Sequence, residues 1–225
     1  MRLLAGQRVR GILLTPADSD KTDPALLGVP VVLLDQSAKP DGCSVSVDDV
    51  QGGWLAVDHL LDLGHRSLAF VGGPDAIRQH ADRFDGARGA IAARGLNPDA
   101  VLSRVRTSAI DISAGVAAVE ELLALPARPT AIFCANDVLA FGVYRGLALR
   151  GITVPDEISI MGYDDIDVAA DWIVPLTSVR QPTAEIGKVA TNLLLEHSSG
   201  SSRHEHQQIV FQPTLVARQS TAAIR

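Results

Sequence analysis

Residues 134–165 read CANDVLAFGVYRGLALRGITVPDEISIMGYDD, and this stretch is the most informative part of the chain for both fold and site. The apolar run 130–134 predicts a short strand, Asn136 can cap the helix that follows, and Gly151 can end that helix before the next strand at 158–162. Asn136 and Asp164 therefore follow the ends of two successive strands. In an open parallel α/β sheet the carboxyl ends of the strands form the ligand crevice, so both side chains are candidates for a binding site.

Outside this stretch, apolar runs of strand length alternate with helical patterns. The alternation predicts an α/β protein with a parallel sheet that helices cover on both faces. After Pro175 the pattern changes to a short strand, a helix that begins after Pro182, a flexible polar linker and a late strand. The expected strands are 9–14, 31–34, 67–71, 101–105, 130–134, 158–162, 176–179 and 208–216; the expected helices are 50–63, 83–94, 112–125, 138–150 and 184–196; the linker is 198–202.

Composition limits the classes of partner. The chain has 225 residues, 47% of them hydrophobic, and a formal net charge of -6 without a long basic cluster. Because phosphate neutralisation supplies most non-specific affinity for nucleic acid, we do not expect this chain to grip DNA by itself. No apolar run approaches the ~20 residues of a membrane helix and the N-terminus does not resemble a secretory signal, so we expect a cytoplasmic protein without membrane contact. Cys43, expected in a loop, and Cys134, expected in a strand, show no CxxC spacing and are expected to be free thiols.

Signatures of enzymes are missing from the sequence. It contains no GxGxxG, GxxxxGK[ST] or GxSxG motif, and Gly72-Gly73-Pro74 lacks the later glycines of a phosphate cradle. The spacing of His204 and His206 would allow a metal site on a strand, but a solvated surface is the favoured interpretation because no third ligand is in view. We therefore expect no cofactor, no metal and no catalytic residue.

Each candidate binding residue also has an ordinary structural explanation. Asn136 is a common helix N-cap, Asp164 and Asp165 are typical of turns, and Arg83, placed at a helix start, could form a surface ion pair with Asp82. Their coincidence at strand-to-helix junctions of one sheet favours a ligand site. A cation, an amide and a carboxylate suit a small polyhydroxylated or heterocyclic ligand, and three such hydrogen bonds with apolar contact can supply the ~8 kcal/mol of a micromolar complex. No side chain in this set pairs a nucleophile with a base, so binding is favoured over turnover.

The order of these motifs resembles the lactose/galactose repressor (LacI/GalR) family of bacterial transcription regulators. The resemblance covers nearly the whole chain and rests on segments that are specific in combination. These segments are VRGILL (9–14), VPVVLLD (29–35), HLLDLGHR (59–66), RFDG (83–86), PTAIFCAND (129–137), VPDEISIMGYDD (154–165) and PLTSVRQP (175–182).

The resemblance implies a two-lobed fold of the type I periplasmic-binding-protein class, with three crossovers and an effector between the lobes. By position, Arg83, Asn136 and Asp164 match polar effector contacts of the family, and Asp35 and Gln36 match contacts from the opposite lobe. Ile110 falls where relatives often place an aromatic ring over the ligand. An aliphatic side chain there favours a sugar or related polyol over a flat purine.

The crossovers are expected near Val47, Arg180 and Phe211. They would divide the chain into an N-terminal lobe, 1–47 with 181–209, and a C-terminal lobe, 48–180 with 210–225. Family members carry a helix-turn-helix headpiece and two strand-helix units ahead of the point that matches Met1, so the N-terminal lobe is expected to be truncated.

From these features we expect the effector-binding and dimerisation core of a regulator that binds operator DNA only through the missing N-terminal domain and forms a homodimer at full length. The isolated chain is expected to bind no operator and to bind effector weakly at most. The alternatives are a sugar-binding protein of a transport system, which has the same fold, and a hydrolase or transferase that uses Asp164 or Asp165 as a base.

Overall fold

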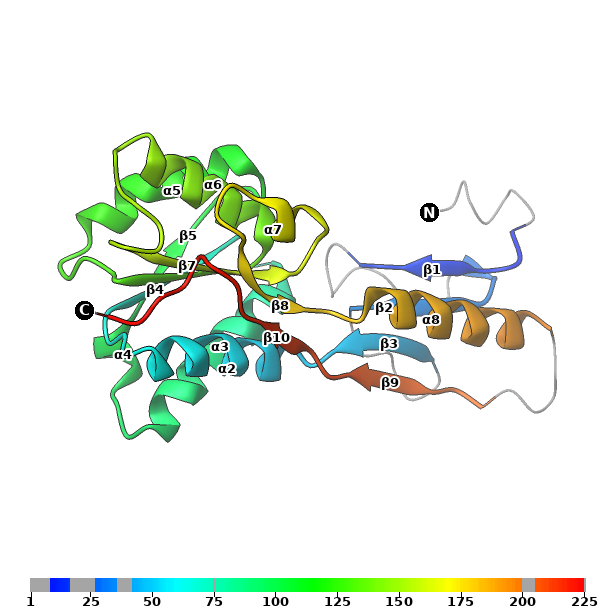
Figure 1. Ribbon diagram of the computed structural model, residues 1–225. Helices are drawn as coiled ribbons and strands as arrows, with labels where there is room; N and C mark the ends of the chain where they lie inside the picture. The colour runs from blue at the N-terminus through cyan, green and yellow to red at the C-terminus, as the bar shows by residue number, and fades with distance from the viewer. Residues whose placement is uncertain (1–8, 17–26, 36–41, 75, 200–204, 225) are drawn as a thin grey trace. The chain divides into compact units, whose positions relative to one another are not determined.

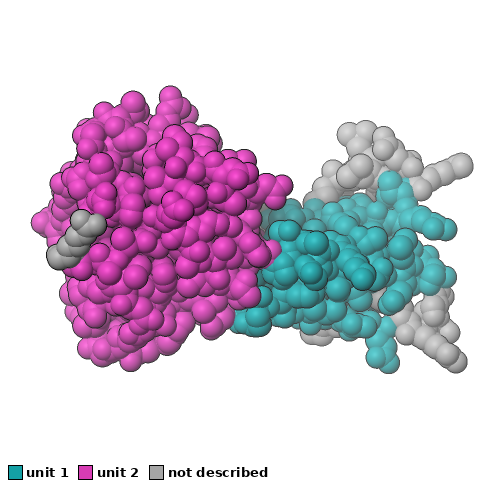
Figure 2. All heavy atoms as spheres, in the orientation of Figure 1, with its two compact units in different colours: residues 1–48, 182–212 teal, residues 49–181, 213–225 magenta. Residues whose placement is uncertain are grey.

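The computed structural model describes residues 9–16, 27–35, 42–74, 76–199 and 205–224 and separates them into two compact units (Figures 1 and 2). Unit 1 comprises residues 1–48 and 182–212, and unit 2 comprises residues 49–181 and 213–225. The chain therefore passes between the units at three places along its sequence, after Asp48, after Gln181 and after Gln212.

Unit 2 is built on a six-stranded sheet with the strand order β10-β8-β7-β6-β4-β5. Five of the strands are parallel, and only β10 runs antiparallel, against β8. The chain moves outward from β4 to β5 and then returns past β4 to β6, so the strand order reverses between β4 and β6. Ligands bind at such a switch point in open α/β sheets. The strands are β4 (Leu68–Gly72), β5 (Leu102–Arg106), β6 (Ala131–Cys134), β7 (Ser159–Asp164), β8 (Thr177–Arg180) and β10 (Thr214–Val216).

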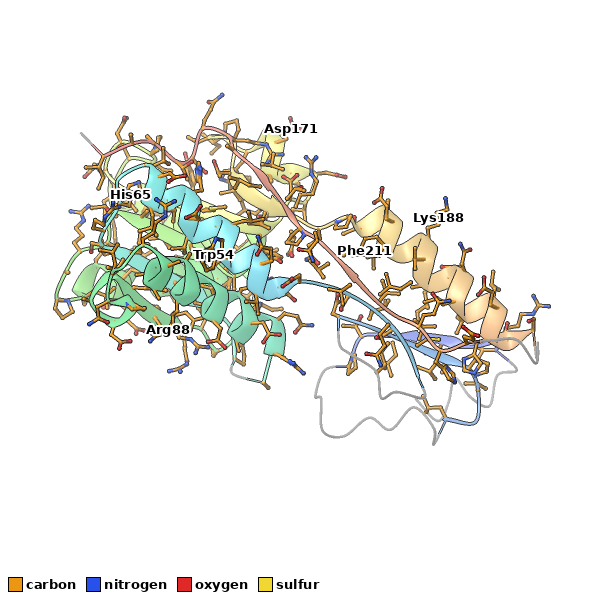
Figure 3. All side chains as sticks on the ribbon, turned by 90° about the horizontal axis from the view of Figure 1, so that it is seen from below. Trp54, His65, Arg88, Asp171, Lys188 and Phe211 are labelled. Carbon is orange, nitrogen blue, oxygen red and sulfur yellow. The ribbon has the colours of Figure 1, made fainter. Side chains whose placement is uncertain are left out.

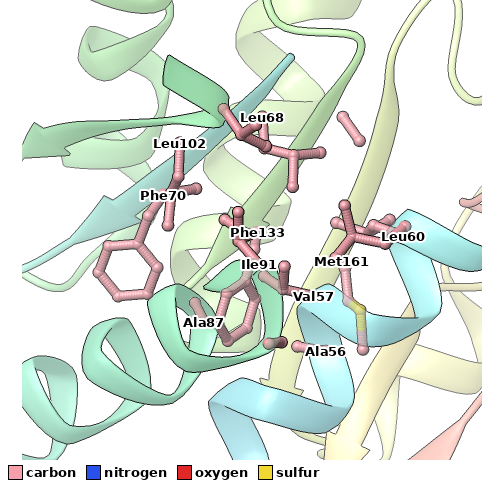
Figure 4. Close-up of a cluster of buried hydrophobic side chains, with 14 of the residues drawn as sticks. Ala56, Val57, Leu60, Leu68, Phe70, Ala87, Ile91, Leu102, Phe133 and Met161 are labelled. Atoms are coloured by element: carbon pink, nitrogen blue, oxygen red, sulfur yellow. The ribbon is translucent and has the colours of Figure 1, made fainter. Parts of the chain in front are cut away.

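Helices cover both faces of this sheet, with α2 and α3 on one side and α5 and α6 on the other (Figure 1). Alternate side chains of the central strands supply the two cores, as the two-residue period of a strand requires. Phe70 and Phe133 pack toward α2 and α3 (Figure 4), whereas Val71 and Ile132 pack toward α5 and α6. The prediction of a parallel sheet with two covered faces is confirmed. The helices are α2 (Asp49–Asp62), α3 (Arg78–Ala93), α4 (Pro98–Val101), α5 (Ile112–Ala124), α6 (Asp137–Ala148) and α7 (Val168–Asp171).

Two glycines allow α2 and α3 to approach closely. A Cβ atom on Gly53 would lie 1.9 Å from the backbone oxygen of Arg83, and a Cβ on Gly86 would lie 1.9 Å from the backbone oxygen of Val50. Only residues without a side chain fit at these two crossings. The close approach brings the N-terminal part of α2 next to residues 83–86 of α3. Trp54 of α2 also packs against this core (Figure 3).

Unit 1 contains a parallel sheet with the strand order β1-β2-β3-β9. One face packs against α8 through Val32, Val45, Ile186 and Ala190. The alternate side chains Val31 and Leu33 belong to a separate apolar cluster with Ile12. The elements are β1 (Ile12–Leu14), β2 (Val31–Leu34), β3 (Cys43–Val47), α8 (Thr183–Ser198) and β9 (Gln208–Phe211).

Four sequence-based predictions of elements were wrong. Cys43 lies in the strand β3 and not in a loop. This strand was missed in the sequence because serines alternate with its apolar residues. The expected strand 208–216 is divided into β9 in one unit and β10 in the other, since Pro213 lacks an N–H for either ladder. Helix α3 begins at Arg78, five residues before the expected start. Its first turn was missed in the sequence because that turn buries the polar His80 and no apolar side chain. Ser198 closes helix α8 and is not part of a linker.

Both cysteines are buried free thiols, as expected. Among the described residues, no helix combines the length and the apolar character needed to cross a membrane.

Candidate functional site

Arg83 is the centre of a polar cluster at the carboxyl edge of the unit 2 sheet. It lies in the second turn of α3 and is only 5% exposed. Its Nε donates to Oδ1 of Asp49 at 2.8 Å, and its Nη1 donates to the carbonyl oxygen of Ala135 at 2.6 Å. The guanidinium carbon lies 3.5 Å from the centre of the Tyr163 ring, which is within the range of a cation–π contact. These contacts join α3 to the start of α2 and to the ends of β6 and β7.

The pKa of Arg83 is raised above its ordinary value. Burial by itself disfavours the charged guanidinium, but the carboxylates of Asp49 and Asp164 and the ring of Tyr163 more than offset this effect. Arg83 therefore stays charged at every physiological pH. A buried positive charge with two nearby carboxylates can recognise a polar ligand without changing its own protonation.

Asp164 is the last residue of β7 and presents a carboxylate at the same edge. Its Oδ1 accepts a hydrogen bond from Nε2 of Gln181 at 2.6 Å and lies 3.9 Å from Nη1 of Arg83. The side chain is 29% exposed, so solvent or a ligand can reach it. Its φ of 104° lies in the left-handed region that non-glycine residues rarely adopt.

Asn136 follows β6 and caps α6, as its sequence position predicted. Its Oδ1 accepts from the backbone N–H of Leu139 at 2.9 Å. The cap uses the oxygen of the amide, so Nδ2 keeps its donor capacity for another acceptor. The cap and a ligand contact are therefore compatible roles for this buried side chain.

The structure corrects one expectation about Arg83 and decides against one alternative. It lies within α3 and not at a strand-to-helix junction, because α3 begins earlier than expected. It also forms no surface ion pair with Asp82. Asp82 instead pairs with Arg78 at 3.4 Å, while Arg83 points inward to Asp49, a residue 34 positions away in the sequence.

Ile110 lies beyond β5, in the connection to α5, and is 44% exposed. A Cβ on Gly73, which follows β4, would lie 2.6 Å from Cγ2 of Ile110 and 3.1 Å from the ring of His80. Ile110 therefore adds an accessible aliphatic surface beside the end of β4. His80 accepts a hydrogen bond at Nδ1 from the N–H of Gly73 at 2.9 Å, and burial, with Arg83 and Arg104 nearby, lowers the pKa of His80 to about 4.

The two remaining predicted contacts belong to unit 1. Asp35 follows β2 with a φ of 58°, and its N–H donates to Val45 O at 3.0 Å. Gln36 lies outside the described residues. The structure thus gathers Arg83, Asn136 and Asp164 at one sheet edge with Ile110 nearby, and it places Asp35 in the other unit.

Three residues of this cluster were not singled out from the sequence. Asp49 and Gln181 bind Arg83 and Asp164 directly, and Tyr163 lies under the guanidinium. Tyr163 reads as an ordinary apolar strand residue, and Asp49 as one acidic residue in a helix's first turn. A signal was available for Asp49, since it follows the apolar segment 43–47 in the same manner as Asn136 follows its strand.

The site offers hydrogen bonds and charge. Within the described part of the chain, no three His, Cys, Asp or Glu side chains are grouped so that they could hold a metal ion. His206, from the sequence-predicted alternative of a metal site, has Nδ1 3.5 Å from Sγ of Cys43, and His204 lies outside the described residues. Burial raises the pKa of the Cys134 thiol, so it is not a ready nucleophile. The cluster can donate to and accept from hydroxyl groups, which do both.

Comparison with known proteins gives a consistent picture. A profile of the periplasmic binding protein-like domain matches residues 57–221. The ribose operon repressor of Haemophilus influenzae is 32% identical over 230 residues, which is 100% of this chain and 68% of the relative. The transcriptional repressor PurR of Vibrio campbellii is 33% identical over 225 residues, which is 97% of this chain and 66% of the relative. The chain thus spans about two thirds of the length of these curated relatives.

Solved structures agree with the fold. A LacI family transcriptional regulator from Enterococcus faecium with bound ribose has a TM-score of 0.90 and 30% sequence identity, and the match covers 100% of this chain and 84% of that one. The complex of the transcriptional regulator CelR with cellobiose has a TM-score of 0.85 and 32% identity, and that match covers 97% of this chain and 68% of the other.

Proposed function

Since this chain belongs to the LacI/GalR family of transcriptional regulators and carries its periplasmic binding protein-like core, we propose that it binds a small sugar and thereby controls operator binding by another part of the protein. The observation that carries the proposal is the buried Arg83 with Asp164 and Asn136 at the carboxyl edge of the unit 2 sheet. Each of these residues has a polar group that can bond to a hydroxyl. The resemblance found in the sequence names these three residues as effector contacts, and their closeness at one sheet edge supports the proposal.

The chemistry of this cluster favours a polyhydroxylated ligand. Each sugar hydroxyl can donate to Asp164 and accept from Arg83 or from Nδ2 of Asn136. Ile110 adds apolar contact without the aromatic ring that would stack on a flat base. Two similar structures, from Enterococcus faecium and Enterococcus faecalis, have ribose bound, so ribose is the first ligand to test.

DNA recognition is assigned to residues outside this core. The net charge of -6 opposes a phosphate-binding surface on the chain itself. Relatives named as repressors are longer than this chain, which spans about two thirds of them. We infer that effector binding acts on operator affinity through a coupling between two sites, which requires that the effector bind the two states of the regulator with different affinities.

A homodimer is the assembly we propose for the regulator. Three exposed apolar side chains, Ile166, Val168 and Ile173, lie in or beside the short helix α7, and Ile173 is 81% exposed. Trp172 anchors this segment by stacking on Phe141 of α6, with ring centres 4.2 Å apart. An anchored segment with outward apolar side chains suits a second copy of the chain.

Isothermal titration calorimetry of the full-length regulator with D-ribose tests the proposal, because the isolated chain is expected to bind effector weakly at most. We expect saturable binding that Asp164→Asn weakens at least tenfold, because a charged acceptor is lost. Asp99→Asn is the matched control, since Asp99 forms an exposed ion pair with Arg88 at 2.6 Å away from the cluster. Equal affinities for the wild type and Asp164→Asn would refute the assignment of the site, and binding of nucleosides in preference to sugars would refute the ligand class.

A further inference from the structure

Asp137 is a fully buried carboxylate next to the proposed effector site. It is the first residue of α6, directly after Asn136, and its exposed fraction is 0%. Its Oδ1 accepts from the hydroxyl of Ser178 at 2.7 Å, and its Oδ2 accepts from the backbone N–H of Ile166 at 2.9 Å. Neither bond belongs to the cap of α6, so the carboxylate serves the neighbouring strands and not its own helix.

These bonds end on the loop that follows Asp164. Ser178 Oγ, which donates to Asp137, also accepts from the N–H of Asp165 at 3.2 Å. The N–H groups of two successive residues are therefore held, that of Asp165 through Ser178 and that of Ile166 directly by Asp137. Asp164 and Asp165 have φ values of 104° and 54°. Such a conformation persists only where surrounding interactions determine it.

The neighbouring strand leaves space for this carboxylate. A Cβ on Gly162 of β7 would lie 2.1 Å from Oδ1 of Asp137, so any side chain at this position would displace the carboxylate. Gly162, Asp137 and Ser178 come from three different elements of the fold, β7, α6 and β8. Together they form one arrangement that determines where the β7 loop turns.

We propose that Asp137 is a positioning residue: with Ser178 it holds the loop of Asp164 and Asp165 in its left-handed turn, and so directs the Asp164 carboxylate toward Arg83. Asp137 itself touches no ligand in this proposal. The positioning of the loop stands on the contacts above, and its consequence for ligand affinity rests on the proposed function of the site.

Protonation of Asp137 weakens this arrangement. Burial raises the pKa of Asp137 to about 7, the bonds from Ser178 and Ile166 lower it, and Asp164 and Asp165 raise it further. Among the cations beside these acids, Arg83 lies 3.9 Å from Asp164, and Arg180 and Arg218 each lie 2.6 Å from an oxygen of Asp165, so their charges act on Asp164 and Asp165 and not on Asp137. A protonated carboxyl becomes a donor at one oxygen, so it cannot accept both bonds equally well. The loop should therefore loosen as the pH falls through about 7.

Two measurements test the proposal on Asp137→Asn, which keeps the size of the side chain but replaces one acceptor by a donor, and on Ser178→Ala. The first is amide hydrogen exchange without ligand. We expect protection of the Asp165 and Ile166 amides to fall at least tenfold in Asp137→Asn, and that of Asp165 to fall in Ser178→Ala. The amides of Ile132 and Phe133 in β6 should be unchanged, which shows that the fold is intact.

The second measurement is D-ribose affinity by calorimetry between pH 5.5 and 8.5. We expect wild-type affinity to rise with pH across about 7, and Asp137→Asn to bind about tenfold to a hundredfold more weakly with a flat pH profile. Unchanged protection at 165 and 166 in Asp137→Asn would overturn the positioning role whatever the ligand. If Asp164→Asn abolished ribose binding while Asp137→Asn bound like the wild type, the inference would fail and the proposed function would stand. If the wild type bound no ribose but the variant lost protection, the proposed ligand would fail and the positioning role would stand.

Discussion

Replacement of Arg83 by methionine gives a strong test of the site architecture. The change removes the bond to Asp49 at 2.8 Å, the bond to Ala135 at 2.6 Å and the contact with the Tyr163 ring, while it keeps most of the side-chain volume. Loss of one partner of a buried ion pair costs about 3–5 kcal/mol, because the other charge stays buried without compensation. Asp49, only 9% exposed, is that charge here. We expect the free energy of unfolding to fall by about 3–5 kcal/mol.

Tryptophan fluorescence in a urea titration measures the free energy of unfolding of unit 2. The sequence has two tryptophans, Trp54 and Trp172, and both lie in unit 2 together with Arg83. Arg88→Met is the control, because Arg88 forms an exposed pair and should cost less than about 1 kcal/mol. A loss below about 1 kcal/mol for Arg83→Met would refute the account of Arg83 as the charge that stabilises this cluster.

Three further changes probe other parts of the molecule. Asn136→Ser keeps an N-cap oxygen for Leu139 but loses the amide donor, so ribose affinity should fall at least tenfold in calorimetry while stability changes by less than about 1 kcal/mol. Asn136→Ala should lower both the affinity and the stability. Equal ribose affinities in the two variants and the wild type would exclude a ligand role for Asn136. The folded-state pKa of His80, about 4, is below its ordinary value of 6.5, so His80 contributes stability that is complete above pH 6.5 and lost as the pH falls toward 4. Over this pH range the wild type should lose about 2–3 kcal/mol of unfolding free energy relative to His80→Gln in urea titrations. Parallel pH profiles of the two proteins would contradict the lowered pKa. Ile173→Asp should shift the protein to monomers in sedimentation velocity. Leu149→Asp, at a residue 70% exposed near the end of α6, should leave the assembly unchanged. The same distribution of monomers and dimers for both variants would argue against a dimer through α7.

The sequence by itself was sufficient for the fold class and for most elements. Apolar runs such as 131–134 and 68–72 are fully buried strands because both faces of a parallel sheet are covered, and this requirement appears directly in the sequence as unbroken hydrophobicity. The caps were also predictable. Asn136 binds the N–H of Leu139, and Gly64 and Gly151 have the positive φ values of helix ends, since these effects involve only neighbours in the chain.

The predictions that failed depended on contacts between distant residues. The start of α3 was hidden because its first turns bury His80 and Arg83, and a buried charge gives no apolar periodicity. The strand expected over 208–216 spans the crossover expected near Phe211, and the structure divides it into β9 and β10, whose partners β3 and β8 belong to different units.

For the site, the sequence determined which polar residues follow the strands, and the tertiary structure decided what each of them does. Arg83 was a candidate ligand contact with a surface ion pair to Asp82 as the alternative, and the structure shows a buried charge held by Asp49. Asp137 appeared only as the neighbour of Asn136, yet its carboxylate binds Ser178 and Ile166 at the base of the Asp164 loop. Helix caps are local and can be found from spacing, whereas a buried charge must be matched by partners that the fold brings from far along the chain, because an unmatched charge in the interior costs several kcal/mol.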